Sequence, residues 1–274
     1  MRIDSHLHLW VNDPEKYPWQ PIGGYVPEED ASLARYMKVM GENGVDRAVL
    51  VQPTPYGWDN RYLLDCKAAD PEKFKAVVLV DPLSGEASQT IRELEEEGAD
   101  GLRINLQLQP LARWQGEGLN LLLATCTDLQ LPICFQTTPE YLGLIGEVAA
   151  KFEIPFIVDH LGRPEAGCAP DSHGFKKLIN FSDHPNIYVK LSGMNYYSNE
   201  SAPYRDTWSL LQAAKNQFGA DHCIWGSDFP FVEGHWTYAE NMALFNDAVG
   251  FEDEDLEWIM GETARSIWWD DVCG

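Results

Sequence analysis

The chain opens with the sequence MRIDSHLHLW (residues 1–10), in which one apolar residue separates two histidines, His6 and His8. On a β-strand, an i, i+2 spacing places both side chains on the same face. Asp4 stands two positions before His6, so the three side chains are predicted to form one row that faces the inside of a barrel if this segment is its first strand. The row could bind a metal ion, polarise a substrate carbonyl or consist of ordinary polar side chains, and the rest of the chain decides among these.

Seven more short runs rich in Val, Ile, Leu or Phe follow this opening, and helix-like segments separate them. Such runs are typical of parallel strands that are buried on both faces. An open, doubly wound sheet does not normally reach eight such units, so we predict a (β/α)8 TIM barrel forming a single domain over residues 1–274. The predicted strands are residues 2–10, 45–52, 74–80, 100–106, 131–137, 154–160, 186–193 and 221–228.

Three of the intervening segments carry a clear helix signal. Residues 29–44, 86–98 and 200–219 each stop at a glycine. Glycine adopts the left-handed conformation that commonly follows the last turn of a helix. We therefore expect these segments to be helices that end at their glycines.

The composition restricts the partners of the protein. The chain has 43 Asp and Glu residues against 20 Lys and Arg, a formal net charge of −23, which disfavours nucleic acid and anionic membranes. No apolar run reaches the roughly 18 residues of a membrane span, and no signal peptide is visible. The six cysteines form no C-x-x-C pair and no disulfide framework. We expect a cytoplasmic protein with a small-molecule partner.

Polar side chains end several of the predicted strands, and a TIM barrel places its chemistry at the carboxyl ends of its strands. His160 ends the sixth strand and Asp228 ends the eighth. With His6 and His8 they would converge at one mouth of the barrel. Imidazole nitrogens suit Zn²⁺ and similar metals, although the same side chains could instead hydrogen-bond a carbonyl. The sequence therefore predicts an active site built from these four residues.

Basic and amide side chains near strand ends are the candidates for substrate binding. An arginine in a pocket commonly pairs with a carboxylate, although each basic residue could instead pair with a buried acid such as Asp159. Asn195, Tyr196 and Tyr197 stand where barrel enzymes place specificity loops. The substrate-binding candidates are Arg103, Arg163, Lys190, Arg61, Asn60 and Gln136.

Several motifs together resemble the amidohydrolase superfamily and, within it, the amidohydrolase-2 group of TIM-barrel hydrolases. They are IDSHLHLW, GLRIN, VDHLGRP, YVKLSGM, WGSDFPF and GETARSIWW, spread from residue 3 to residue 269. DHLGRP and KLSGM resemble the branch that contains 2-pyrone-4,6-dicarboxylate lactonase and sugar lactonases. The resemblance implies a catalytic site of His6, His8, His160 and Asp228, with Asp228 as the general base.

The resemblance also bears on the metal content. Members with two metals have a bridging Lys or Glu on strand 4 and a His on strand 5, whereas this chain has Arg103 and a glutamine there, so we do not expect two metals. One divalent metal, Zn²⁺ before Mn²⁺, could be held by His6, His8 and Asp228, with His160 as a further candidate ligand. Some members of the lactonase branch use one metal and others none, so metal-free catalysis stays open.

The predicted reaction is the opening of a lactone by water, with sugar lactones slightly ahead of pyrone- or muconolactone-type carboxylated lactones. The first alternative is metal-dependent non-oxidative decarboxylation of an aromatic acid, against which Gln136 argues because such enzymes resemble a pattern with a His there. The second is a non-catalytic binder of a sugar acid or metal. The apolar end of the chain, with Ile267, Trp268 and Trp269, could pack on the barrel or on another subunit, so a homo-oligomer stays open.

Overall fold

Eight parallel strands form a ring in this computed structural model, which describes residues 1–114, 116–247 and 249–270. Each strand pairs with the next in sequence order, and Leu7 pairs in parallel with Phe229, just beyond the eighth strand. This last pair returns the sheet to its first strand, so the predicted (β/α)8 barrel is confirmed. The strands are β1 (Ile3–Leu7), β2 (Arg47–Val51), β3 (Phe74–Leu79), β4 (Gly101–Asn105), β5 (Ile133–Gln136), β6 (Phe156–Val158), β7 (Ile187–Leu191) and β8 (Cys223–Trp225).

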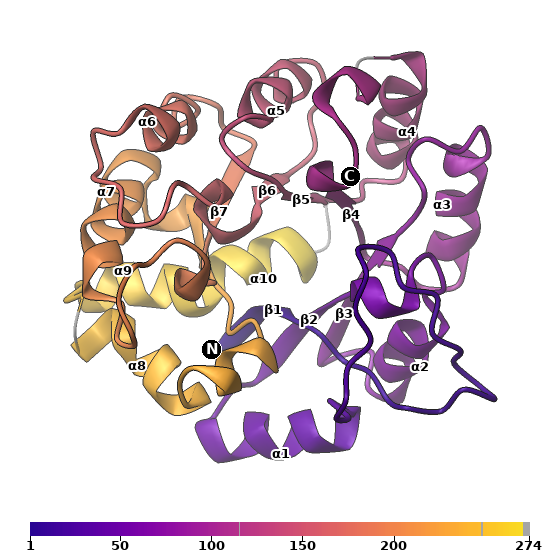
Figure 1. The fold of residues 1–274 in the computed structure, drawn as a ribbon, viewed down its shortest axis with the longest axis horizontal. Coiled ribbons are helices and arrows are strands. Elements are labelled where there is room, and N and C mark those ends of the chain that lie inside the picture. Colours follow the sequence, from indigo (N-terminus) through magenta and orange to yellow (C-terminus); the bar gives the residue numbers. More distant parts are fainter. Residues whose placement is uncertain (115, 248, 271–274) are drawn as a thin grey trace.

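Helices surround this ring and connect its strands (Figure 1). Gly44 ends the first helix at φ 63°, as predicted. The helix predicted over 200–219 begins only at Trp208, because Pro203 lacks an amide hydrogen and disfavours the helical conformation of the residue before it. The helices are α1 (Leu33–Asn43), α2 (Arg61–Ala69), α3 (Ala87–Glu96), α4 (Glu117–Asp128), α5 (Leu142–Ala149), α6 (His173–Ile179), α7 (Trp208–Phe218), α8 (Tyr238–Asp247), α9 (Asp253–Glu257) and α10 (Thr263–Trp268).

The inside of the barrel contains an apolar layer and a polar layer. Toward the amino-terminal ends of the strands, side chains such as Ile3, Val49 and Ile224 cluster with Trp268 of α10, and none of these four is more than 5% exposed. Burial of such surface stabilises the closed sheet by roughly 25 cal/mol per Å². Farther along the same strands, the buried side chains include charged and polar groups. This polar layer lies at the end of the barrel where chemistry is expected.

Asp4 does not join His6 and His8 in a single inward-facing row. Its carboxylate accepts hydrogen bonds from the hydroxyls of Tyr36 on α1 (3.1 Å) and Tyr238 on α8 (2.9 Å), so it faces the helices outside the ring. The register of β1 against β2 shifts within the strand. A β-bulge changes the alternation of side chains between the two faces. The predicted three-residue row is therefore wrong, although the two histidines do lie together.

Three further expectations concern the whole chain. Cys66, Cys126, Cys134, Cys168 and Cys223 are free cysteines. The sixth, Cys273, lies outside the described residues, as does the last part of the predicted domain, residues 271–274. In the described ranges, none of the helices combines the length and the apolar character that crossing a membrane requires.

Candidate active site

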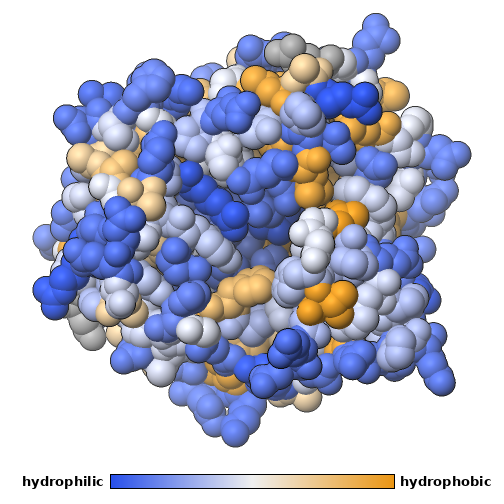
Figure 2. Space-filling view, in the orientation of Figure 1, coloured by the Kyte–Doolittle hydropathy of each residue, from blue (hydrophilic) through white to orange (hydrophobic). Residues whose placement is uncertain are grey.

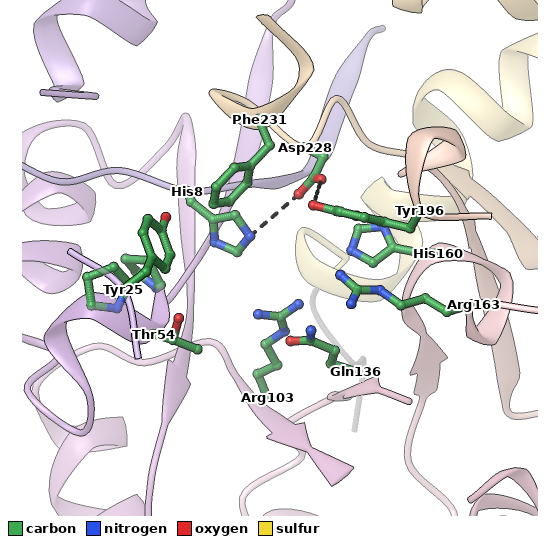
Figure 3. Close-up of a pocket in the computed structure, with 12 residues that line it drawn as sticks. His8, Tyr25, Thr54, Arg103, Gln136, His160, Arg163, Tyr196, Asp228 and Phe231 are labelled. Atoms are coloured by element: carbon green, nitrogen blue, oxygen red, sulfur yellow. Dashed lines mark hydrogen bonds and ion pairs between the residues drawn. The ribbon is translucent and has the colours of Figure 1, made fainter. Parts of the chain in front are cut away.

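A cavity of about 170 Å³ opens at the carboxyl ends of the strands. Figure 2 shows a hollow with a largely hydrophilic surface near the middle of the same face. In Figure 3, His8, His160 and Asp228 lie on one side of the cavity, and the guanidinium groups of Arg103 and Arg163 face it from the other side. The lining residues are His8, Tyr25, Pro53, Thr54, Pro55, Arg103, Gln136, His160, Arg163, Tyr196, Asp228 and Phe231.

Two histidines and one aspartate direct ligand atoms at a common point. The Nε2 atoms of His6 and His8 lie 3.7 Å and 3.6 Å from Asp228 Oδ1, and one ligand atom of each residue lies within 4.8 Å of the other two. Strand β1 carries both histidines, and the Asp228 amide donates to the His6 carbonyl at 2.8 Å, which ties the turn after β8 to β1. His6 Nε2 and Asp228 Oδ1 are buried and have no hydrogen-bond partner among the described residues.

The orientation of His8 bears on whether a metal fits this group. His8 Nδ1 lies 2.8 Å from the carbonyl oxygen of Val51, and because a carbonyl can only accept, Nδ1 carries the proton. The Nε2 lone pair of a neutral His8 therefore points at the Asp228 carboxylate. Two electron-rich atoms at 3.6 Å repel each other unless a proton or a cation lies between them. The arrangement fits a divalent metal, since metal-binding histidines usually donate their second N–H to such an acceptor.

A buried network of charges supports His6 from behind. Lys190 Nζ lies 2.9 Å from His6 Nδ1 and 3.0 Å from Asp159 Oδ1. The Nε of Arg103 donates to Asp159 Oδ2 at 3.0 Å. Burial opposes ionisation of Asp159, but its cationic neighbours, Lys190 foremost, hold its pKa well below the usual value. Lys190 can donate to His6 Nδ1 and Asp159 can accept from it, so this network decides which ring nitrogen of His6 carries the proton.

The protonation states of the site follow from its burial. Desolvation lowers the pKa of His160 to about 3 and lowers that of His6 well below 6.5, the latter with help from Lys190. Both imidazoles are therefore neutral near pH 7. Burial also opposes ionisation of Asp228, but the surrounding histidines, His160 foremost, hold its pKa below the ordinary value. The site presents an ionised carboxylate beside neutral imidazoles, which is the combination that a general base requires.

Tyr196 is a site residue whose contact with Asp228 has no signal in the sequence. Its hydroxyl donates to Asp228 Oδ2 at 2.6 Å, which leaves Oδ1 directed at the Nε2 atoms of His6 and His8. Burial and the charge of Asp228 raise the pKa of Tyr196 well above its usual value, so it stays a donor. Gly193 makes this packing possible, because a Cβ there would lie 2.5 Å from His160 Nδ1. The sequence places Tyr196 in a specificity loop, whereas the structure places it on the carboxylate.

Three residues of the site have left-handed backbone conformations. The φ angles are 54° at His160, 45° at Arg163 and 59° at Asp228. This conformation is uncommon for residues other than glycine, costs about 1–3 kcal/mol each, and clusters at functional sites. The tight turns that follow β6 and β8 thereby bring these side chains to the cavity.

Two arginines give part of the cavity wall a positive charge. Arg163 stacks on the ring of Tyr196 at 3.9 Å, and its Nε is buried with no hydrogen-bond partner in the described part of the chain. Arg103 uses its Nε for Asp159, so its terminal N–H groups remain for a ligand. Gln136, at the end of β5, lines the same cavity. Two guanidinium groups in a partly desolvated wall are suited to a carboxylate or another oxyanion.

Three of the predicted substrate-binding residues do not line the catalytic cavity. Lys190 is fully buried in its network with His6 and Asp159, beneath the cavity. Arg61 has a side chain that is 58% exposed, and it pairs with Asp59 on the outside. Asn60 hydrogen-bonds the backbone of Leu79 with both side-chain atoms and so connects the start of α2 to β3. Ion pairing and backbone bonding, rather than ligand binding, explain these side chains.

His160 also differs from the prediction that counted it among the metal ligands. Its Nδ1 lies 2.9 Å from Ser192 Oγ, and it stands beside the group of His6, His8 and Asp228 rather than within it. Its ring lines the cavity. It is therefore placed to touch a substrate.

A barrel with a buried histidine–aspartate group at the carboxyl ends of its strands defines a class of TIM-barrel hydrolases, and comparison with known proteins agrees with it. The amidohydrolase family profile matches residues 3–268. The chain therefore belongs to the amidohydrolase family.

Individual relatives share most of their length with this chain. A 4-sulfomuconolactone hydrolase from Hydrogenophaga intermedia is 27% identical over 250 residues, covering 89% of this chain and 78% of the relative. An L-fucono-1,5-lactonase from Burkholderia ambifaria is 28% identical over 248 residues, covering 86% and 83%. A solved structure from Pseudomonas putida, provisionally assigned as a 2-pyrone-4,6-dicarboxylic acid hydrolase, is 26% identical, has a TM-score of 0.85 and covers 97% of both chains.

Proposed function

We propose that this protein hydrolyses a lactone that carries a negative charge. The observation that supports this most strongly is the pairing of an ionised carboxylate, Asp228, with a cationic wall across a small cavity. The relatives named above act on lactones according to their names, and two of the three names describe an acidic lactone. Arg103 and Arg163 favour a carboxylated lactone over a neutral sugar lactone, because nothing in a neutral sugar needs two guanidinium groups.

The proposed reaction begins with a water molecule beside Asp228 Oδ1. As the water oxygen attacks the carbonyl carbon of the lactone, its proton passes to Oδ1. The carbonyl oxygen gains negative charge and accepts a hydrogen bond from Nε2 of His160, in the tautomer whose Nδ1 accepts from Ser192. The bond between the carbonyl carbon and the ring oxygen then breaks, and Asp228 returns the proton to the leaving ring oxygen. The product is a hydroxy acid, which releases a proton at neutral pH.

Tyr196 and the arginines position the reacting groups in this scheme. Tyr196 occupies Oδ2 of Asp228, so that Oδ1 is the oxygen offered to the water. Arg103 and Arg163 hold the charged substituent of the substrate on the opposite wall. This fixes the face of the lactone that meets Asp228, and orientation of this kind accounts for a large part of enzymatic rate enhancement.

His6, His8 and Asp228 would hold a divalent metal, with Zn²⁺ favoured over Mn²⁺ by the two imidazole nitrogens. Such a metal would lower the pKa of water and polarise the carbonyl. Elemental analysis of the purified protein tests this part, and one equivalent of metal is expected. The thermal midpoint should fall when a chelator removes it. The His8→Asn variant should bind less than a tenth of an equivalent of metal.

A screen with a pH indicator tests the reaction itself. Purified protein is offered carboxylated lactones and neutral sugar lactones, with and without Zn²⁺ or Mn²⁺. We expect proton release with the carboxylated lactones and at least about tenfold lower kcat/KM with the neutral ones, since a guanidinium–carboxylate pair is lost. A preference for neutral lactones would overturn the assignment of the charge. Consumption of the lactone without acid formation would show isomerisation instead of hydrolysis.

A further inference from the structure

A second cavity, of about 250 Å³, opens on the same face of the barrel, at the carboxyl ends of β3 and β4. Figure 2 shows hydrophobic surface gathered beside the central hollow, on the side where Figure 1 places these strands. Most of its lining residues have apolar side chains, and two of them contribute indole rings. The described lining residues are Ile22, Gly23, Trp58, Leu79, Val80, Asp81, Pro82, Leu83, Asn105, Leu108, Gln109 and Trp114.

The second cavity adjoins the catalytic cavity along β4. Arg103 lines the catalytic cavity and Asn105 lines the second one. These two residues are successive positions on one face of the strand, about 7 Å apart along it. Asn105 is paired in register with Gln136, which again lines the catalytic cavity. A ligand that contacts Arg103 and extends along β4 toward Asn105 therefore reaches the second cavity.

A short stretch of the long loop after β1 contributes residues to both cavities. The amide of Ile22 donates to the carbonyl of Thr54 at 3.0 Å, which fastens this loop above the barrel. Ile22 faces the second cavity, whereas Tyr25 and Thr54 line the catalytic one. The two cavities therefore lie next to each other along this stretch of the loop.

The two compartments have opposite electrostatic character. Arg103 and Arg163 contribute positive charge to the catalytic cavity. Among the described residues that line the second cavity, Asp81 alone is charged, and its Oδ1 accepts the Leu83 amide at 3.0 Å. A carboxylate in the second cavity would meet this negative charge and apolar walls, without a cation to offset the loss of its hydration. The second cavity is suited to an uncharged group.

The size and exposure of the two cavities point to their joint use. A cavity of about 170 Å³ is smaller than the usual range of roughly 300–1,000 Å³ for ligand pockets. It offers room for a lactone ring with its charged substituent and for little more. At the rim of the second cavity, Trp58 and Leu83 are each 37% exposed, so an apolar group seated there would remove apolar surface from water.

We propose that the second cavity binds an uncharged alkyl or aryl substituent of the substrate, while the charged end of the same lactone faces Arg103 and Arg163. The proposal rests on the proposed function and narrows its substrate class to anionic lactones with an apolar arm. The positive charge of the catalytic cavity and the negative charge of Asp81 in the second cavity then select the orientation of the substrate. The reaction that supplies such a substrate must leave an apolar side chain on the lactone ring.

A substituent series tests the proposal. The kcat/KM of a carboxylated γ-lactone is compared with those of its butyl- and phenyl-substituted counterparts. Each methylene that is transferred from water contributes about fourfold, so the substituted lactones should be better substrates by at least about tenfold in the native protein. Leu83→Glu and Trp58→Ala should reduce this advantage to below about threefold. Leu121→Glu, at a position on α4 that is 60% exposed, is the matched control and should retain it.

Two results would overturn the subsite. One is turnover of the parent lactone without any advantage of the substituted ones, which leaves lactone hydrolysis intact. The other is an advantage that survives both Leu83→Glu and Trp58→Ala. If the protein hydrolyses no lactone, calorimetry with the corresponding hydroxy acids still tests whether the second cavity binds an apolar substituent. Tighter binding of the phenyl-substituted acid that is lost in Leu83→Glu would support the subsite while lactone hydrolysis fails, and equal binding of both acids would refute it.

Discussion

The two ends of the barrel use the same strands to bury opposite kinds of side chain. Ile224 of β8 packs into the apolar cluster. Asp228, in the turn that follows this strand, is an ionised carboxylate that is 2% exposed. In β6, the fully buried Ile157 is followed two residues later by the fully buried Asp159. Burial of apolar surface stabilises a fold, whereas burial of charge costs free energy unless partners offset it.

A layer of ion pairs separates the two ends. Lys190 Nζ reaches Asp159 on the polar side and lies 3.5 Å from the sulfur of Cys134, which belongs to the apolar cluster. The comparison teaches that the apolar cluster at the amino end stabilises the barrel, whereas the carboxyl end accepts a cost in stability for its chemistry. Substitutions at the two ends should therefore separate stability from activity.

The largest effect on stability is expected where the two layers meet. Lys190→Met leaves the buried Asp159 carboxylate with one cation fewer, and removal of one partner from a buried ion pair costs about 3–5 kcal/mol. Urea unfolding measures the loss. Lys38→Met is the control, because this lysine is 77% exposed and pairs with Glu42 on the surface, and exposed pairs contribute at most about 1 kcal/mol. Equal losses in both variants would contradict the buried network.

At the carboxyl end, Asp228→Asn should reduce kcat at least about 10²-fold, because the amide cannot take a proton from water. Its thermal midpoint should stay close to that of the metal-free native protein, since the buried carboxylate is kept for function rather than for stability. Steady-state kinetics and a thermal melt give both values. Asp128→Asn, at an acid whose side chain is 70% exposed, should keep the full rate. A near-native rate in a well-folded Asp228→Asn protein would remove the residue from the role of general base.

The pH dependence of stability should show the neutral state of His160. Its pKa is about 3 when folded and about 6.5 when unfolded, so protons bind preferentially to the unfolded chain. The contribution of neutral His160 to the free energy of unfolding is complete above pH 6.5 and is lost progressively as the pH falls toward 3. Between pH 7 and pH 5 the native protein should lose about 2 kcal/mol more unfolding free energy than His160→Gln. If the unfolding free energies of the two proteins, measured with urea, fell by the same amount between pH 7 and pH 5, the burial argument would be contradicted.

At the amino end, Ile224→Val should cost about 1 kcal/mol, the usual consequence of removing one buried methylene. The residue is fully buried in the apolar cluster, so the loss should appear in urea unfolding and leave kcat/KM within twofold. A loss of activity without a loss of stability would show that the two layers are not separate.

The smallest effect is expected at Arg61, which the sequence placed among the substrate contacts. Arg61→Ala should change the unfolding free energy by less than about 0.5 kcal/mol, and KM should stay the same. The reason is that its side chain is 58% exposed and pairs with Asp59. A rise in KM would restore a role in substrate binding.

Much of the framework follows from local patterns. The eight apolar runs predict the strands because a parallel strand buried on both faces must be continuously apolar. The position of His8, His160 and Asp228 at strand ends then places them at one mouth, as the structure has it. Lys190, Arg61 and Asn60 were predicted to bind substrate but do not line the cavity, and the reason is the same for all three. A sequence does not show whether a lysine such as Lys190 finds a buried acid or a ligand.

The sequence alone determined the barrel, the histidine pair and the acidic exterior, because these depend on side-chain periodicity and composition. Only the tertiary structure decided which polar groups reach the cavity. The register shift between Asp4 and Leu7 puts Asp4 and the two histidines on different faces of β1, and left-handed turns aim His160 and Asp228 inward. The second cavity joins residues from separate loops, such as Ile22, Leu83 and Trp114. Such meetings depend on packing between segments distant in the chain, which no local pattern encodes.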